Sequence, residues 1–382
     1  MKTPVSVRIL LFSFLILILG LVVYSYTQID LNLTLFSFSS YQYIQHSLIQ
    51  IGYYQRPLSA SLFLILTGGL FTVYISLLRL ILKQKISESH IKIFVGISLL
   101  CLLAYPAFSH DLFNYMFDAR IATYYHLSPY FFKALDFPTD PWIRFMHWTH
   151  RYYPYGPGWL LITLIPSWLG MGKFVGTLML FKVMLGGFYI ASTYVIYKIL
   201  QKIHPTQALF GVTFFTLNPL VIIESLVSGH NEIVMVGFLL ISLYWLLSNK
   251  IHITAISFLA SVSIKFVSLI LLPLFMISPK INRKWISTAF LIYGLALMVV
   301  VFQRELYGWY LVPLVSLAAM GTKWPQLVMI ALSGGVITSY MPYLLFGTYG
   351  AQTTLWQYWT MIITSCIYGL LFLVLCKKDL YT

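Results

Sequence analysis

Residues 7–26 read VRILLFSFLILILGLVVYSY, twenty residues in which Arg8 is the only charge. About 20 apolar residues are what an α-helix needs to cross the hydrocarbon core of a bilayer. The backbone of such a segment must satisfy its hydrogen bonds internally, so a helix is predicted. Lys2 and Arg8 form a basic start, but no small-residue cleavage site follows. We therefore expect a retained helix rather than a cleaved signal peptide.

Apolar runs of this kind recur along the whole chain. Of its 382 residues 59% are hydrophobic and 9% are charged, whereas soluble globular domains are about one quarter charged. We predict an all-α, polytopic transmembrane protein that forms a single integral membrane domain over residues 1–382. About twelve spans are expected, at residues 7–27, 59–82, 93–108, 158–171, 174–200, 207–228, 233–249, 252–277, 285–303, 308–321, 325–346 and 356–377.

The charge distribution predicts which side each loop faces. The formal charge is +14, but the basic residues lie mostly in short loops beside apolar runs. This pattern suits contact with anionic membrane lipids, and no nucleic-acid partner is expected. Three clusters, KQKISESHIK (83–92), SPKINRKW (278–285) and the tail CKKDLYT (376–382), are expected in the cytoplasm. Residues 28–58 and 109–157 then face the other side.

Two of the predicted spans, 158–171 and 308–321, are short for a full crossing. Either could be a half-helix that turns back, because irregular backbone is tolerated at membrane depth where it lines a cavity enclosed by protein. If 158–171 turns back, every later segment is inverted until the next such hairpin.

The loop 109–157 holds four of the ten acidic residues. In SHDLFNYMFDARIATYYHLSPYFFK (109–133), Asp111, Tyr115 and Asp118 have the spacing i, i+4, i+7, which places them on one stripe of a predicted helix. A solvated amphipathic helix on the membrane surface would explain this spacing. Asp111, however, directly follows an apolar run, where a carboxylate is partly desolvated and its basicity can rise. It is therefore a candidate catalytic residue.

A second interfacial helix is predicted in DPWIRFMHWTHRYYPYGPGW (140–159), with Asp140 as N-cap and Pro141 as the first helical residue. Arg144, His147 and Arg151 would then share a face. A cationic face at that depth suits a phosphate group. It equally suits a basic surface helix attracted to anionic lipid.

Metal and cofactor sites are not expected. His147 and His150 lie three residues apart, but no third ligand stands near them in the sequence. The cysteines, Cys101, Cys366 and Cys376, show neither a CxxC motif nor paired spacing.

Polar residues also occur inside later apolar runs. LNPLVIIESLVSGHNEIVMVGF (217–238) contains Glu224, His230, Asn231 and Glu232 after the helix-breaking Asn218-Pro219. Ionisable groups at membrane depth usually mark a site, although a short loop between two spans is the alternative interpretation. Lys265 lies about midway along its run, which predicts an anionic partner.

The motifs in these segments resemble the bacterial GT-C superfamily of membrane glycosyltransferases, and more closely the mannosyltransferases that use polyprenyl-phosphate-mannose. The resemblance rests on HDLFNYMFDARIATYYHLSPY, YPYGPGW, NPLVIIESLVSGHNE and IKFVSLILLPL, and it covers about residues 105–275. The chain departs from the family pattern at Phe113 (usually Tyr), Ser128 (usually Asn) and Glu232 (usually Asp). The last hundred residues are expected to add only hydrophobic spans.

The resemblance implies ten to thirteen helices and a bacterial plasma membrane with the active site facing outside. It implies inverting transfer of a sugar, mannose or another hexose or pentose, from a polyprenyl-phosphate donor to a hydroxyl of a lipid or glycan acceptor. Asp111 would be the catalytic base, and no metal is required. Candidate substrate contacts are Tyr115, Asp118, Arg144, His147, Arg151, His230, Asn231, Glu232 and Lys265, among which Arg144, Arg151 and Lys265 would hold the phosphate.

The resemblance conflicts with the charge pattern at one point. It implies that His230 and Asn231 face the same cavity as Asp111, whereas twelve full spans place them on the opposite side. A re-entrant hairpin between residues 158 and 232 would remove the conflict.

Two functions from other classes stay open at this stage. A transporter or flippase for lipid-linked sugars would explain Lys265 and the broken helices, but no matching pair of interrupted segments is found in two halves of the chain. A glycan polymerase or ligase would be expected to carry its large external loop late in the chain rather than at 109–157.

Overall fold

The computed structural model describes residues 5–31, 33–277, 281–302 and 305–380, and within these ranges every regular element is helical, as predicted. Lys2, Lys280 and residues 381–382 of the basic tail lie outside the described residues. The α-helices are α1 Val5–Ser25, α2 Ser39–Ile49, α3 Arg56–Leu82, α4 Glu88–Ser98, α5 Asp111–Thr123, α6 Pro157–Leu169, α7 Phe174–Ile203, α8 Ala208–Thr216, α9 Pro219–Ile222, α10 Glu232–Leu246, α11 Ile251–Ile264, α12 Leu272–Ile277, α13 Arg283–Val301, α14 Val312–Met320, α15 Lys323–Thr338, α16 Met341–Phe346 and α17 Ala351–Leu380.

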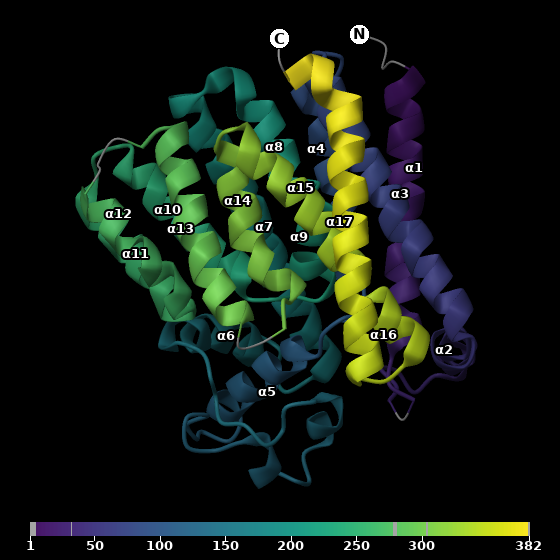
Figure 1. Cartoon of the computed structure of the whole chain (residues 1–382). Coiled ribbons are helices and arrows are strands. Elements are labelled where there is room, and N and C mark those ends of the chain that lie inside the picture. Colours follow the sequence, from purple (N-terminus) through teal and green to yellow (C-terminus); the bar gives the residue numbers. More distant parts are fainter. Residues whose placement is uncertain (1–4, 32, 278–280, 303–304, 381–382) are drawn as a thin grey trace.

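Both ends of the chain lie at the same end of the molecule. Figure 1 shows α1 beginning and α17 ending at the top, and α5 with its surrounding loop at the bottom. The turn between α3 and α4 and the start of α13 also lie toward the top. The described parts of the basic clusters therefore gather on one side, and residues 109–157 lie on the other.

Within the described residues, six helices are long and apolar enough to cross a membrane: Val5–Gln28, Arg56–Leu82, Phe174–Ile203, Arg283–Val301, Lys323–Phe346 and Ala351–Leu375. The pair Pro205–Thr216 and Pro219–Val227, bent by 51°, makes a seventh if it counts as one span. Other apolar helices in the described residues are shorter, so the predicted twelve full-length spans are not confirmed.

The predicted span 158–171 does not cross the molecule. It forms α6, and the N–H of Gly156 just before it donates to the carbonyl of Ile264 at the end of α11 (3.4 Å). Near the other end, the hydroxyls of Ser167 and Thr123 are 2.8 Å apart, and Thr123 ends α5. Both ends of α6 therefore lie on the α5 side, and α6 is a half-helix that turns back.

A second departure compensates for the first. The predicted span 252–277 is broken at Lys265, whose extended backbone (φ −142°, ψ 125°) separates α11 from a 3-10 turn at Phe266–Leu271. Lys265 and Asp111 line the same cavity, so the chain reaches the α5 side at this break and turns back toward α12. One crossing is lost at α6 and one is gained at Lys265, which keeps the basic loops on one side.

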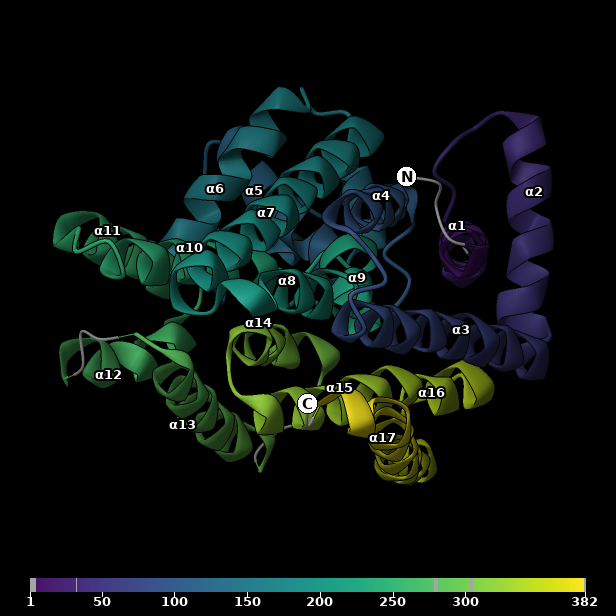
Figure 2. The same ribbon diagram turned by 90° about the horizontal axis from the view of Figure 1, so that it is seen from above.

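The other short segment, 308–321, runs through the molecule rather than turning back. At its start Gly308 lies so close to Glu224 that a Cβ there would overlap the carboxylate. At its end the carbonyl of Gly321 accepts two hydrogen bonds from Arg283, at 2.8 and 2.6 Å. Every residue of α14 is buried, as expected for a helix that is hydrophobic all round except at Ser316. Figure 2 shows α7, α8 and α10 on one side of α14, and α15 and α17 on the other.

Candidate active site

A cavity of about 1120 Å³ lies beside the start of α5. Its wall is built by residues from several parts of the chain: 28, 30 and 53; 107–111; 147, 148, 151 and 154–156; 232; 264–267; 293, 297 and 300; 305–307, 309 and 310; and 339, 340, 343, 344, 349, 354, 357, 358 and 361. Of the residues that the sequence singles out, Asp111, His147, Arg151, Glu232 and Lys265 line it. The cavity therefore brings one carboxylate from the 109–133 motif together with cations from two other parts of the chain.

Asp111 is the first residue of α5, where the helix dipole favours a negative charge. Its backbone N–H donates to the hydroxyl of Ser109 at 3.2 Å, and its side chain is 17% exposed. Burial raises the pKa of Asp111, while the charges of Lys265 and Arg151 oppose that rise. The environment therefore favours a carboxylate more basic than an ordinary aspartate.

His230 lies directly behind Asp111. Its Nδ1 is 3.8 Å from an Asp111 carboxylate oxygen, and its Nε2 is 3.3 Å from a Glu224 carboxylate oxygen. The ring is buried and stacks on Trp309 with 4.0 Å between ring centroids. The Tyr340 hydroxyl donates to the other oxygen of Glu224 at 2.7 Å. Asp111, His230, Glu224 and Tyr340 thus form a row of polar groups that runs from the cavity wall into the protein.

The chain reaches His230 through a broken helix. Asn218 caps α9 by accepting the N–H of Leu220 at 3.0 Å, and a π turn follows at Ile223–Val227. Lys182 on α7 donates to the carbonyls of Leu226 and Val227 at 2.6 Å each, which satisfies backbone acceptors that no longer have a helical partner. Gly229 then takes a φ of +79°, a conformation that favours glycine.

Lys265 forms an ion pair with Glu232, so the predicted anionic partner is confirmed. Glu232 begins α10 and Lys265 follows the end of α11, and these two helices pack side by side. Both residues line the cavity, and the Lys265 ammonium group is directed at the Glu232 carboxylate.

The second interfacial helix predicted after Asp140 is wrong. Only a 3-10 turn forms, at Pro141–Phe145, so Arg144, His147 and Arg151 do not share a helical face. Arg144 is exposed and is not part of the cavity wall. Asp140 does cap this turn, accepting the N–H of Trp142 at 2.9 Å.

Three other predicted contacts lie behind the wall rather than on it. The ring of Tyr115 packs against Tyr155 and Trp159, with 5.1 Å between centroids in both pairs. Asp118 is buried on the same stripe of α5, and burial raises its pKa to about 8. The amide of Asn231 is fully buried, and neither of its polar atoms has a hydrogen-bond partner among the described residues.

The sequence analysis missed several residues of the wall. The last hundred residues were expected to add only spans, but they supply Tyr307, Trp309, Tyr310 and Tyr340 to the cavity, so that expectation is wrong. Glu224, which lies behind the wall, carries a usable signal, a carboxylate in an apolar run, but its sequence context assigns it no role. The aromatic residues carried none, because aromatic side chains are common at membrane interfaces.

Comparison with known proteins identifies the family of the chain. Residues 35–279 match a family model described as alpha-(1->6)-mannopyranosyltransferase, N-terminal domain. Searches of curated proteins and of solved structures gave no match. The matched region contains Asp111, Arg151, His230 and Lys265. Since it covers more than half of the chain, the protein belongs to the alpha-(1->6)-mannopyranosyltransferase N-terminal domain family and is a glycosyltransferase acting on mannose.

Proposed function

We propose that this protein is a multi-pass membrane enzyme of the GT-C type that transfers mannose from a polyprenyl-phosphate donor to a hydroxyl of a lipid or glycan acceptor, with inversion. The observation that carries the proposal is the cavity wall, where the Asp111 carboxylate lies within electrostatic reach of Lys265 and Arg151. The reaction takes place on the side of the membrane that holds residues 109–157, outside the cytoplasm.

The wall offers the two groups that such a transfer needs. Asp111 takes the proton of the acceptor hydroxyl as that oxygen forms a bond to the anomeric carbon. The bond between the anomeric carbon and the phosphate oxygen breaks, and its electron pair leaves with the phosphate. Lys265 and Arg151 stabilise the charge that develops on that phosphate. Because the sugar phosphate is already activated, the scheme needs no further reagent.

The size of the cavity supports two substrates rather than one. Pockets for a single drug-sized ligand are typically about 300–1,000 Å³, and this cavity is larger, at about 1120 Å³. A mannosyl phosphate and the accepting end of a glycan therefore fit side by side. His230 is buried and contacts neither the mannosyl phosphate nor the glycan, so we assign it a positioning role behind Asp111.

The experiment that tests the proposal uses the full chain reconstituted in liposomes with polyprenyl-phosphate-mannose and a mannosylated glycolipid acceptor. Mass spectrometry should detect a new mannosyl bond and free polyprenyl phosphate. Movement of the donor across the membrane without a new bond would identify a transporter instead.

Two arginines of the same loop provide a matched comparison. Arg151 lines the cavity and Arg144 does not. Arg151→Ala removes a charge-assisted contact, worth about 1.5–3 kcal/mol, so the KM for the donor should rise on the order of 10- to 100-fold. Arg144→Ala should leave that KM unchanged. If both variants change the KM for the donor equally, Arg151 does not contact the donor.

A further inference from the structure

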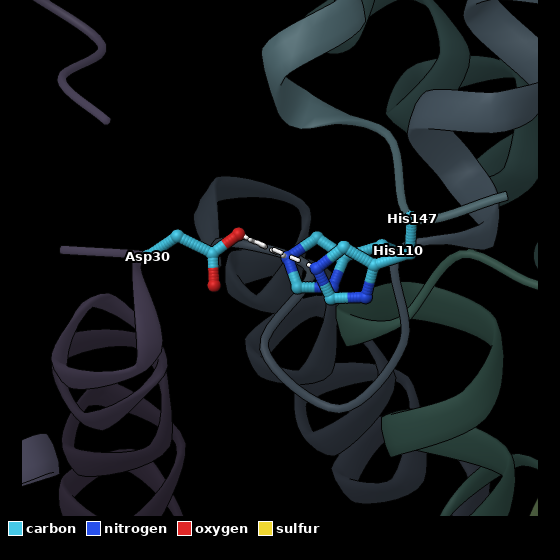
Figure 3. A group of neighbouring side chains, drawn as sticks. All are labelled: Asp30, His110 and His147. Carbon is cyan, nitrogen blue, oxygen red and sulfur yellow. Dashed lines mark hydrogen bonds and ion pairs between the residues drawn. The ribbon is translucent and has the colours of Figure 1, made fainter. Parts of the chain in front are cut away.

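Asp30, His110 and His147 form a cluster at the edge of the cavity. They come from three segments: the chain after α1, the residue before α5, and the loop after the Pro141–Phe145 turn. One Asp30 oxygen lies 3.6 Å from Nε2 of His110 and 3.4 Å from Nε2 of His147. Figure 3 shows both imidazoles directed at the same carboxylate, and their ring centroids are 3.7 Å apart.

The three candidate ligand atoms all lie within 4.8 Å of one another, as atoms that share one metal ion must. Zinc binds histidine nitrogen and carboxylate oxygen at about 2.0–2.2 Å with tetrahedral geometry, which places two ligand atoms roughly 3.4 Å apart. The two separations at Asp30 lie at or near that value. The hydrogen bonds that the cluster does make are long: 3.4 Å between His147 Nε2 and Asp30, and 3.3 Å between the Tyr105 hydroxyl and His110 Nε2. Ordinary hydrogen bonds measure about 2.7–3.2 Å, so these bonds satisfy the groups only weakly.

The surroundings hold these groups in place. The side chain of His110 is only 10% exposed, so little bulk water competes for its ring nitrogen. The second oxygen of Asp30 accepts a hydrogen bond from the Tyr53 hydroxyl at 3.3 Å. Such an outer contact orients a metal-binding carboxylate.

We infer that Asp30, His110 and His147 bind one divalent transition-metal ion of the zinc class. Two imidazoles and one carboxylate are a known zinc ligand set, and they leave the fourth position open. All three residues line the cavity, so water or an anionic oxygen of a bound molecule can complete the coordination from the cavity side. His110 precedes Asp111 in the chain, so the ion also ties the start of α5 to two other segments.

The test measures metal binding by the full chain in detergent, after the protein has been stripped with a chelator. Isothermal titration with Zn²⁺ should show one ion per chain, and Co²⁺ should give the intense visible absorption of a tetrahedral site. Asp30→Asn and His147→Ala should each weaken binding by more than the roughly 10- to 100-fold that loss of an outer contact costs. Asp136→Asn and His150→Ala are the matched controls, since Asp136 and His150 lie in the 109–157 loop outside the cluster, and both should bind like the parent.

Folding of the variants is checked separately by the unfolding temperature without metal, which the parent and a folded variant should share. Added Zn²⁺ should raise that temperature in the parent and controls only. Absence of binding by the parent, or equal binding by the parent, Asp30→Asn and His147→Ala, overturns the inference. Because no step of the measurement uses mannosyl transfer, its result is independent of the proposed function.

Discussion

At the scale of single residues, His230 lies between two carboxylates. Its ring reaches Asp111 on one side and Glu224 on the other, and Trp309 covers its face. A neutral imidazole has one N–H and one acceptor nitrogen. If the N–H points to Glu224, the Nδ1 lone pair faces Asp111. The 3.8 Å between Nδ1 and the Asp111 carboxylate is longer than a hydrogen bond, so His230 backs Asp111 with a polar surface rather than a direct bond.

The first prediction concerns Asp111. Asp111→Asn keeps the size of the side chain but cannot accept the acceptor proton, so kcat should fall on the order of 10²- to 10⁴-fold while donor binding persists. Turnover and donor binding are measured in the same liposomes, with Asp136→Asn as the control in an exposed part of the loop. Unchanged turnover would exclude Asp111 as the base, and a larger loss in Asp118→Asn or Glu232→Gln would transfer the role.

The candidate base could be predicted from the sequence, but its surroundings could not. Acids are scarce in this chain, and Asp111 follows an apolar run, which singles it out. Its contact with His230 joins distant segments and depends on the orientation of α6. Hydropathy left that orientation open, and only the family resemblance pointed to a shared cavity.

The second prediction concerns stability and pH. Asp118 is buried near Arg151, Asp111, Tyr153 and Tyr155, and its pKa is raised by burial from 3.8 to about 8. The folded state therefore holds a proton that the unfolded state releases, so this contribution to stability is present below about pH 4 and is lost as the pH rises through about 8.

The unfolding temperature of the purified parent should accordingly fall between pH 5 and 8 more steeply than that of Asp118→Asn, which cannot ionise. Tryptophan fluorescence during heating measures it. Parallel pH profiles for the two proteins would show that Asp118 does not titrate in this range.

At the scale of elements, packing decides where helices form in the 109–157 loop. The spacing of Asp111, Tyr115 and Asp118 predicts α5, and the helix is present. The helix predicted after Asp140 stops at Met146, whose backbone is extended (φ −95°, ψ 142°). Just before it, Phe145 stacks on Phe174 with 4.0 Å between centroids, a contact between distant segments that a local pattern cannot report.

The third prediction concerns the broken helix that carries Glu224 and His230. Lys182→Met removes the donor to the carbonyls of Leu226 and Val227, and buried acceptors left without a partner cost about 1–3 kcal/mol. The variant should unfold at a lower temperature and lose kcat more than donor affinity, because His230 shifts. Lys198→Met, on the same helix, is the control and should change neither. If folded Lys182→Met keeps the kcat of the parent, Lys182 does not influence the active site.

At the scale of the whole molecule, two errors in the predicted spans cancel. A half-helix such as α6 and a span broken at Lys265 both look like ordinary apolar runs, since hydropathy reports length and composition but not direction. The basic loops nevertheless fall on one side (Figure 1), because the crossing lost at α6 is regained at Lys265. Between the two errors, however, the predicted orientation is inverted.

The fourth prediction uses that inverted region. Met171 follows α6, and Lys250 lies between α10 and α11; both are exposed. Twelve full spans would place position 171 in the cytoplasm and position 250 outside, whereas the structure places position 171 with the α5 side and position 250 with the basic loops.

In a parent whose three cysteines are replaced by serine, an impermeant maleimide added from outside should label Met171→Cys and the reference Asp136→Cys. Lys250→Cys and the reference Lys85→Cys should react only in inverted membranes. Labelling of Met171→Cys together with Lys85→Cys would mean that α6 crosses the bilayer, and the cavity shared by Asp111 and His230 could not form.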